Sequence, residues 1–362
     1  MADQPILKSH RRPGIETTVV SVTSVKFGDG SYPVIAGPVA VESREQILRA
    51  AQTVVDAGGS ILRAGTFLAG SSPYGYRGLG AEGVWMLEHA GHEAGIPVST
   101  EILEPDHVGV VAGHVDVIEI GPDNMQNFVL LRAVGDCSCP VIVHRAPAAT
   151  IDEWLLAAEY VLDAGNPNVV LCERGSRGFD PRTSETLDIT AIPAVQQLSH
   201  LPVVVAPATA AGHPELVQPL AIAARSAGAD GLIVPCHPDP PNALAGNGSQ
   251  LDPERFAVLM EALGIPSIRD EIDRIDRQVI RLLARRLRSS VDIAKIKAER
   301  ELAMRSPDRE AELIAEMRAD SDAVGMDPDY AQELMEVVLR HSRAAQRRAV
   351  GREHGAADHR SS

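Results

Sequence analysis

The stretch PVSTEILEPDHVGVVAGHVDVIEIGPDNMQNFVLLRAVGDCSCPVIVHR (97–145) contains three short apolar runs, each ended by Gly, Pro or a polar residue. Runs of this kind are typical of buried parallel strands. Five more lie outside it: VIAGPV (34–39), ILRAG (61–65), VVLCERG (169–175), VVVAP (203–207) and GLIVPC (231–236). Helical stretches separate the runs. The sequence therefore predicts an α/β fold in which eight strands and their helices form a closed (β/α)₈ TIM barrel.

The main competing fold is a doubly wound open sheet, but no GxGxxG motif follows the first strand. The segment VVSVTSVKFGDG (19–30) predicts a short β hairpin ahead of the barrel. We therefore expect four parts, which are an N-terminal β extension at 1–32, the barrel at 33–264, an all-α domain at 265–350 and a disordered tail at 351–362.

The all-α domain begins with SIRDEIDRIDRQVIRLLARRLRSSVDIAKIKAEREL (267–302), where Ile, Val and Leu recur at helical spacing. Ser306-Pro307 and Asp327-Pro328 are predicted starts of two further helices, the last running to about Val350. The first helix is too long for two shorter helices to cover. We therefore expect a homodimer through this three-helix domain.

Composition excludes several classes of function. The net charge is −15 with 3% aromatic residues, which argues against nucleic-acid binding. No apolar run is long enough to span a membrane, and the first residues lack the apolar core of a signal peptide. Four cysteines do not make a disulfide framework in a chain of 362 residues. These features predict a cytoplasmic protein with no membrane or nucleic-acid partner.

Charge is unevenly distributed along the chain. Residues 1–265 hold 15 basic and 30 acidic residues, so the whole net charge of −15 lies there. The only lysines in that part are Lys8 and Lys26. Because neither follows a predicted barrel strand, Schiff-base chemistry inside the barrel is excluded.

Polar side chains follow several predicted strands. Catalytic groups of TIM barrels lie where the strands end, so these side chains are candidates for one shared site. The candidates for an anion-binding mouth are Arg63, His144, Arg145, Glu173 and Arg174.

Several segments carry a family resemblance, among them GPVAVES (37–43), SSPYGYRGLG (71–80), IGPDNMQN (120–127), LDITAIPAVQQLSHLPVVV (187–205) and HPDPPNAL (237–244). Together they resemble DAHP synthase of the type I-beta group over residues 15–263. That family condenses phosphoenolpyruvate with erythrose 4-phosphate on a divalent metal. The resemblance implies a barrel of this fold.

The chain departs from that family at the metal site. The four positions that the resemblance aligns with the family's Cys, His, Glu and Asp ligands hold Val39, Thr209, Pro235 and Gly246. Divalent metals need thiolate, imidazole or carboxylate donors, which these side chains do not supply. We therefore expect no divalent metal in the barrel.

The positions implied to bind phosphate also differ. The family's KPRT segment aligns with 68–71, which reads LAGS, and Asp123, His144 and Ala206 replace an Arg, a Lys and an Asp. Phosphorylated substrates normally require Arg or Lys clamps. We therefore expect a structural or regulatory barrel without DAHP synthase activity, which associates with an active DAHP synthase. Two alternatives stay open, a bifunctional DAHP synthase/chorismate mutase and a barrel with new chemistry.

The C-terminal part carries a second resemblance. IRDEIDRIDRQVIRLLARRLRSSVDIAKIK (268–297), SPDREAELI (306–314) and HSRAAQ (341–346) resemble the all-helical bacterial chorismate mutase family. Helical spacing of 17 and 11 residues places Arg269, Arg286 and Lys297 on one helix face. The positions that match the family's active-site pattern are Arg269, Arg286, Lys297, Arg309, Glu310, Ser342 and Gln346.

The resemblance implies a role for each of these residues in turning chorismate into prephenate, a rearrangement that needs no cofactor. Arg286 and Arg309 would hold the substrate carboxylates, with Ser342 also binding substrate, and Arg269 would enter the site of the partner subunit. Lys297 and Gln346 would stabilise the ether oxygen, and Glu310 would accept a hydrogen bond from the ring hydroxyl. Ser306 stands where the family usually has Asp, which leaves 4-amino-4-deoxychorismate as an alternative substrate.

Overall fold

The computed structural model describes residues 7–11, 14, 17–69, 74–180, 185–246, 248–266, 268–300, 303 and 306–358. For residues 268–271, 273, 274, 277, 278, 299, 322, 323 and 350–358 the description is of the backbone alone. The chain divides into two compact units, Met1–Arg269 and Asp270–Ser362. This division lies inside a helix, a few residues beyond the boundary expected after residue 264.

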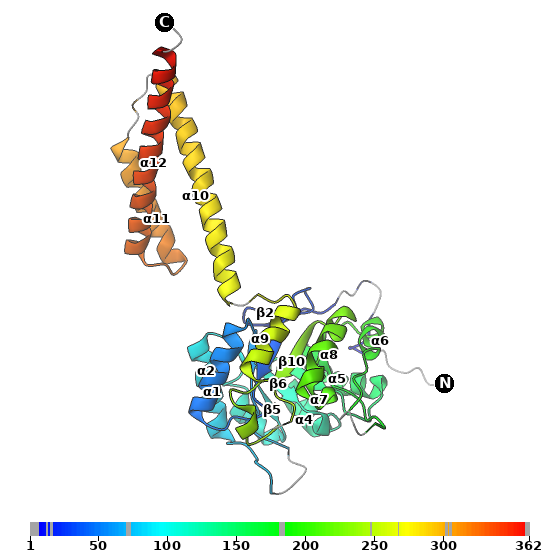
Figure 1. The fold of residues 1–362 in the computed structure, drawn as a ribbon. Helices are drawn as coiled ribbons and strands as arrows, with labels where there is room; N and C mark the ends of the chain where they lie inside the picture. Colours follow the sequence, from blue (N-terminus) through cyan, green and yellow to red (C-terminus); the bar gives the residue numbers. More distant parts are fainter. Residues whose placement is uncertain are drawn as a thin grey trace. The chain divides into compact units, whose positions relative to one another are not determined.

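The first unit is a closed barrel of eight parallel strands, in which the last strand pairs with the first (Figure 1). All eight predicted runs form strands, and the predicted barrel is confirmed. The strands are β3 (Val34–Gly37), β4 (Ile61–Arg63), β5 (Val98–Ile102), β6 (Val117–Ile120), β7 (Val141–His144), β8 (Val169–Glu173), β9 (Val203–Val205) and β10 (Gly231–Pro235).

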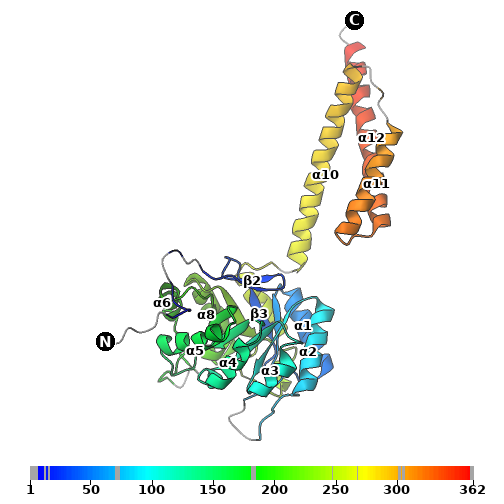
Figure 2. The same cartoon turned by 180° about the vertical axis from the view of Figure 1, so that it is seen from behind.

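Helices surround the barrel, as both views show (Figures 1 and 2). Local capping explains several helix starts. For example, Thr150 and Glu153 form a capping box before one helix, and Ser43 and Asp252 cap two others. The helices are α1 (Arg44–Asp56), α2 (Ala81–Ala94), α3 (Pro105–Val111), α4 (Phe128–Gly135), α5 (Ile151–Ala164), α6 (Ala191–Leu198), α7 (Pro207–Ala211), α8 (Pro214–Ser226) and α9 (Pro253–Ala262), with short 3₁₀ helices η1 (Pro122–Asn124) and η2 (Pro240–Asn242).

The predicted hairpin is also present, as the antiparallel strands β1 (Val20–Val22) and β2 (Val25–Phe27). Its Val20, Val22 and Phe27 join the same buried apolar cluster as the inward-facing side chains of the barrel strands. Since that cluster includes residues near the strand starts, such as Ile35 and Ile61, the hairpin closes this end of the barrel. A site can therefore form only at the other end, where the strands finish.

The second unit consists of three helices, α10 (Ile268–Glu299), α11 (Pro307–Ala323) and α12 (Pro328–Asp358). The predicted helix starts are confirmed, but α12 extends beyond the expected end near Val350, into the segment where a disordered tail was expected. Helix α12 continues to Asp358 through RRAVGREHGAAD (347–358), which has three Ala, three Arg and no Pro, although it contains two Gly. Residues 359–362 lie outside the described part. Among the described helices, none is both long and apolar enough to cross a lipid bilayer.

Candidate functional site

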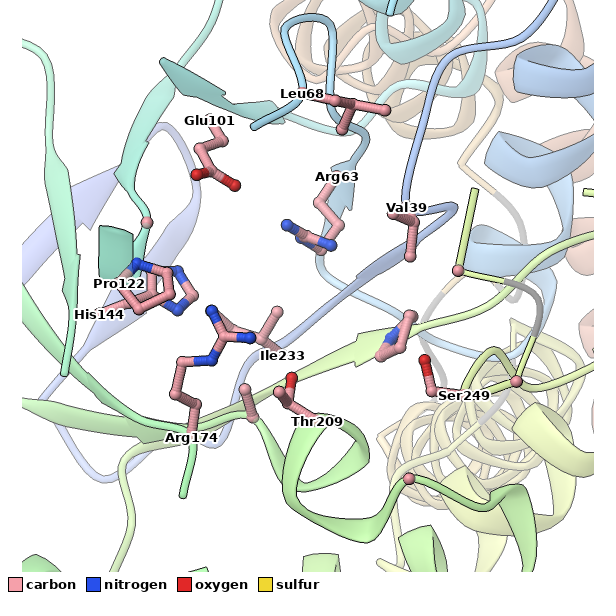
Figure 3. Close-up of a pocket in the computed structure, with 16 residues that line it drawn as sticks. Val39, Arg63, Leu68, Glu101, Pro122, His144, Arg174, Thr209, Ile233 and Ser249 are labelled. Carbon is pink, nitrogen blue, oxygen red and sulfur yellow. The ribbon is translucent and has the colours of Figure 1, made fainter. Parts of the chain in front are cut away.

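The open end of the barrel contains a cavity of about 490 Å³ (Figure 3). Arg63, His144 and Arg174, all predicted as mouth residues, line it together with Glu101. Apolar side chains such as Leu68, Pro122 and Ile233 complete much of the wall. The cavity is therefore a mixed polar and apolar pocket rather than a filled barrel end.

A buried carboxylate, Glu119 of β6, organises the floor of this cavity. Arg63 donates to both of its oxygens at 3.2 and 3.1 Å, and the Ser99 hydroxyl donates at 2.9 Å. His144 Nε2 lies 3.1 Å from Oε2 of the same carboxylate. Burial opposes ionisation, but the charge of Arg63 and these hydrogen bonds hold the pKa of Glu119 well below its usual range. Sequence reasoning missed Glu119, although a Glu inside a continuous apolar strand was a usable signal.

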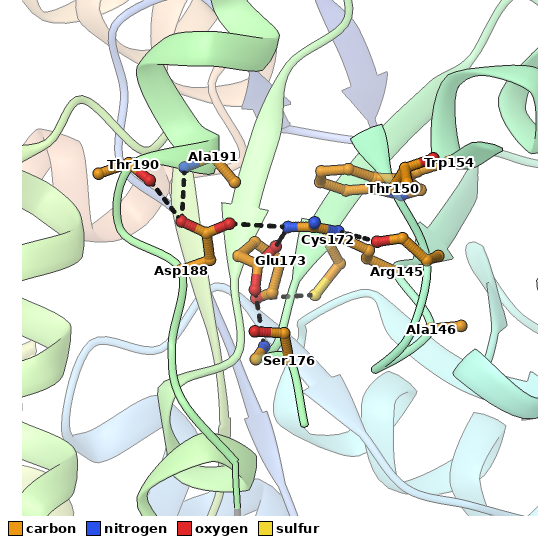
Figure 4. A network of polar contacts seen from close by, with 12 residues as sticks. Arg145, Ala146, Thr150, Trp154, Cys172, Glu173, Ser176, Asp188, Thr190 and Ala191 are labelled. Atoms are coloured by element: carbon orange, nitrogen blue, oxygen red, sulfur yellow. Dashed lines mark hydrogen bonds and ion pairs between the residues drawn. The ribbon is translucent and has the colours of Figure 1, made fainter. Parts of the chain in front are cut away.

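Arg145 and Glu173 do not line the cavity, in contrast to their expected place at the mouth. Arg145 Nη1 donates to Glu173 at 2.8 Å and to Asp188 at 3.2 Å, and its Nε donates to the carbonyl of Ala149 (Figure 4). Glu173 also accepts from the backbone N–H of Gly175 at 2.7 Å. Adjacent side chains of an extended chain point to opposite sides. Arg145 follows His144, and Glu173 precedes Arg174. Because His144 and Arg174 face the cavity, Arg145 and Glu173 point away from it. Through these contacts, Arg145 and Glu173 link the loop that follows β7 to the loop that follows β8.

The four positions that the family resemblance aligned with metal ligands do meet in one place. Val39, Thr209, Pro235 and Gly246 all line this cavity. A Cβ atom added at Gly246 would come within 2.5 Å of Cγ2 of Val39, so the Val39 side chain fills the space that a side chain at 246 would need. Among the described residues, no group of three or more His, Cys, Asp or Glu side chains could hold a metal ion. These residues do not fit a divalent metal.

Glu101 gives the cavity a pH dependence. Burial, with a further contribution from the charge of Glu119, raises its pKa to about 7. The unfolded pKa of a Glu is about 4.3, and the folded pKa of Glu101 is higher. As pH rises from the unfolded pKa through the folded pKa, the protein therefore loses stability. We therefore expect Glu101→Gln to leave the melting temperature of the barrel unchanged near pH 4 and to raise it by about 2–4 °C near pH 8. Thermal unfolding at both pH values checks this, and an equal shift at both would contradict it.

The helical unit contains a second cavity, of about 370 Å³, between its three helices. Its lining includes every mutase candidate whose side chain is described: Arg286, Lys297, Ser306, Arg309, Glu310, Ser342 and Gln346. Arg269 belongs to the first turn of α10, but its side chain lies outside the described residues. Positions far apart in sequence thus converge on one pocket.

Polar contacts hold several of these side chains. Arg286 Nη1 donates to the buried Ser342 hydroxyl at 2.9 Å. Gln346 Nε2 donates to both the carbonyl and the hydroxyl oxygen of Ser290, at 3.0 and 2.7 Å. Lys297 Nζ donates to the carbonyl of Ala303 at 3.3 Å. These contacts fix three donors in the wall of the pocket.

Charge in this pocket is strongly positive. Its lining holds four cations and a single carboxylate, Glu310, which accepts from Arg343 Nη1 at 3.0 Å. Arg309 is exposed and donates to Glu312 at 2.9 Å. Sequence reasoning missed Arg343, which lies three residues before Gln346 and could have been found from helical spacing. The pocket suits a ligand with more than one carboxylate.

The two units thus define a class of protein in which a TIM barrel with an open polar mouth is joined to a helical domain with a cationic pocket. The DAHP synthetase I family matches residues 15–265, and the chorismate mutase type II family matches residues 268–347. The chain therefore belongs to the DAHP synthetase I family and carries a C-terminal chorismate mutase type II domain, as the sequence resemblances indicated.

Two aldolases and a solved structure resemble the barrel. A phospho-2-dehydro-3-deoxyheptonate aldolase of Thermotoga maritima is 42% identical over 248 residues, which cover 68% of this chain and 73% of that protein. A 2-dehydro-3-deoxyphosphooctonate aldolase of Psychromonas ingrahamii is 30% identical over 232 residues, or 59% of this chain and 82% of that protein. The crystal structure of a Thermotoga maritima DAHP synthase matches with a TM-score of 0.70 at 40% identity, covering 73% of this chain and 77% of that one.

Proposed function

We propose that the helical domain is a chorismate mutase that rearranges chorismate to prephenate without a cofactor. The observation that carries this proposal is the convergence of Arg286, Lys297, Arg309, Glu310 and Gln346 on one pocket. Chorismate carries two carboxylates, and guanidinium groups hold carboxylates in fixed, bidentate geometry. The reaction is a concerted rearrangement, so holding the reactive conformer is itself catalytic.

Charge stabilisation is the second contribution of the pocket. Negative charge develops on the ether oxygen as its bond breaks, and a positioned donor lowers the energy of that state. Lys297 and Gln346 are the donors assigned to this oxygen. Gln346 donates to Ser290 in the structure, so substrate binding would require it to exchange that partner for the substrate oxygen.

Turnover of chorismate by the purified full-length protein, with the product identified by NMR, tests this proposal. Parallel rates on 4-amino-4-deoxychorismate test the alternative substrate, for which Ser306 is the reason. If the amino analogue is turned over faster, we would conclude that it, and not chorismate, is the substrate.

We further propose that this domain forms the homodimer. Helix α10 exposes an unusual number of apolar side chains, namely Ile272, Ile275, Val279, Ile280, Leu282, Leu287, Ile293 and Ile296. Such a face is normally buried against another chain. Because Arg269 is expected to enter the partner's site, dimer formation would also complete each active site.

The dimer has a direct test. Ile280, with 67% of its surface exposed, is the most exposed of these residues. We expect Ile280→Glu to convert the dimer to a monomer in sedimentation equilibrium and to reduce chorismate turnover in parallel. Val258→Glu, an exposed apolar position on α9, is the control and should change neither. A wild-type protein that sediments as a monomer would contradict the proposal.

For the barrel, family membership favours the alternative, a bifunctional DAHP synthase/chorismate mutase, over an inactive barrel, which no comparison supports. The side chains in its mouth are the reason to propose otherwise. The aligned ligand positions hold Val39, Thr209, Pro235 and Gly246, and only the threonine offers a donor. We therefore propose a barrel without DAHP synthase activity. Metal-dependent condensation of phosphoenolpyruvate with erythrose 4-phosphate by the full-length protein would establish the bifunctional enzyme instead.

A regulatory barrel would act through a partner, and we propose an active DAHP synthase in that role. Exposed apolar residues on α4 and α5, namely Phe128, Val129 and Leu156, support a contact surface there. A pull-down with a catalytic DAHP synthase tests it, and failure to bind would end the proposal. The cytoplasmic location expected from the sequence stays a prediction.

A further inference from the structure

The mouth of the barrel holds polar atoms that no protein group satisfies. Nδ1 of His144 and Nε of Arg174 are both buried, and neither has a hydrogen-bond partner. Only 6% of the surface of His144 is exposed. Both residues line the cavity of about 490 Å³, and the close-up shows the Arg174 guanidinium extending into it (Figure 3). Buried polar atoms without a protein partner are rare in native proteins, so this pair is available to a ligand that enters the cavity.

The protonation state of His144 follows from its neighbours. The carboxylate of Glu119 is held ionised by Arg63, so it can only accept a hydrogen bond. Nε2 of His144, 3.1 Å from that carboxylate, must therefore carry a proton and donate it. Burial lowers the pKa of His144, which keeps the ring neutral. Nδ1 is consequently a bare acceptor, and a ligand must offer it an O–H or N–H group.

The charge balance of the mouth defines the second requirement. The charge of Arg63 is matched by its ion pair with Glu119. Among the described lining residues, Arg174 is the cation that lacks an ion pair. While Glu101 is protonated, a single negative charge on the ligand would neutralise Arg174, whereas a phosphate dianion would leave one charge uncompensated beside Glu101. The nearby apolar side chains suit a carbon skeleton.

We propose that the barrel mouth binds a small, unphosphorylated hydroxy acid, whose single carboxylate pairs with Arg174 and whose hydroxyl donates to Nδ1 of His144. This site is independent of the mutase pocket and needs no metal. The hydroxyl requirement makes the site selective, because a ligand without it would leave the buried Nδ1 unpaired.

Calorimetric titration of the full-length protein at neutral pH tests this with matched probes. Lactate and mandelate carry the hydroxyl, while propionate and phenylacetate are the same acids without it. We expect each hydroxy acid to bind about 10-fold more tightly than its partner. Phosphoenolpyruvate and inorganic phosphate are the competing probes and should bind more weakly than the hydroxy acids.

Variants assign the binding to this cavity. Arg174→Gln should weaken hydroxy-acid binding by about 10-fold or more, because it removes the unpaired charge. Arg174 has no ion pair to lose, so the variant should fold, which thermal unfolding confirms. Arg177→Gln, an exposed arginine nearby, is the matched control and should bind as the wild type does.

His144→Phe removes the acceptor and should abolish the preference for the hydroxyl while leaving acid binding through Arg174. Four results would overturn the proposal: tighter binding of phosphate or phosphoenolpyruvate, equal binding of acids with and without the hydroxyl, unchanged binding in Arg174→Gln, or no binding of any hydroxy acid at about 10 mM.

Discussion

Replacement of Arg286 by Ala is expected to lower the kcat/KM for chorismate by about 10³-fold, because it removes a charged donor from the substrate carboxylate. The side chain lies in the pocket wall, and its donation to Ser342 at 2.9 Å fixes the orientation of the guanidinium. Arg286→Lys should recover only part of the loss, since an ammonium keeps the charge but not the planar pair of donors.

Arg288, exposed on the same helix and absent from the pocket lining, provides the matched control. Arg288→Ala should keep turnover close to that of the wild type. Separate measurement of kcat and KM shows whether Arg286 acts in binding or in the transition state. An Arg286→Ala enzyme within about threefold of wild type would remove the proposed mutase site from this pocket.

The fold was predictable from sequence because apolar periodicity and breakers act locally. Eight apolar runs correspond to eight strands, and Pro307 and Pro328 open helices where expected. The end of α12 was not predictable in the same way. Gly351, the residue type that most often ends a helix, directly follows Val350, yet α12 continues through it to Asp358.

Side-chain direction at the strand ends was the part that sequence could not supply. His144 faces the cavity while the adjacent Arg145 joins a buried ion-pair network, and Arg174 faces the cavity while the adjacent Glu173 does not. Adjacent residues point to opposite sides, so one member of each pair had to turn away. Which one does so depends on partners such as Glu119 and Asp188 that come from other strands and loops.

The residues that line the pocket were easier to predict from sequence in the helical unit than in the barrel. Helical geometry converts a spacing into a face directly, so the sequence alone places Arg286 and Lys297 together. The carboxylate that organises the barrel mouth, Glu119, needed three-dimensional information because its partners Arg63, Ser99 and His144 come from three different strands.

Glu119→Gln is expected to destabilise the barrel by about 3–5 kcal/mol at neutral pH, since it leaves the largely buried Arg63 without its counter-charge. An amide has the shape of a carboxylate but only one acceptor oxygen. The carboxylate now accepts from Arg63, Ser99 and His144, so the new NH₂ group would face at least one donor. The loss therefore comes from both charge and hydrogen bonding.

Urea unfolding monitored by tryptophan fluorescence measures this in the full-length chain. Both tryptophans, Trp85 and Trp154, lie in the barrel, so the signal reports that unit alone. Glu261→Gln, at an exposed position on α9, is the matched control and should change the free energy of unfolding by less than about 0.5 kcal/mol. A double variant, Arg63→Gln with Glu119→Gln, should lose less than the sum of the two single variants.

The pH dependence of this effect has a definite sign. The folded pKa of Glu119 is depressed, so its ionised form contributes stability above the unfolded pKa of about 4.3, and that contribution is lost as pH falls toward the folded pKa. The difference between wild type and Glu119→Gln should therefore be largest near pH 7 and should shrink below about pH 4. A difference that stays constant from neutral to acidic pH would mean that the ion pair with Arg63 does not stabilise the barrel, and that packing alone accounts for the loss.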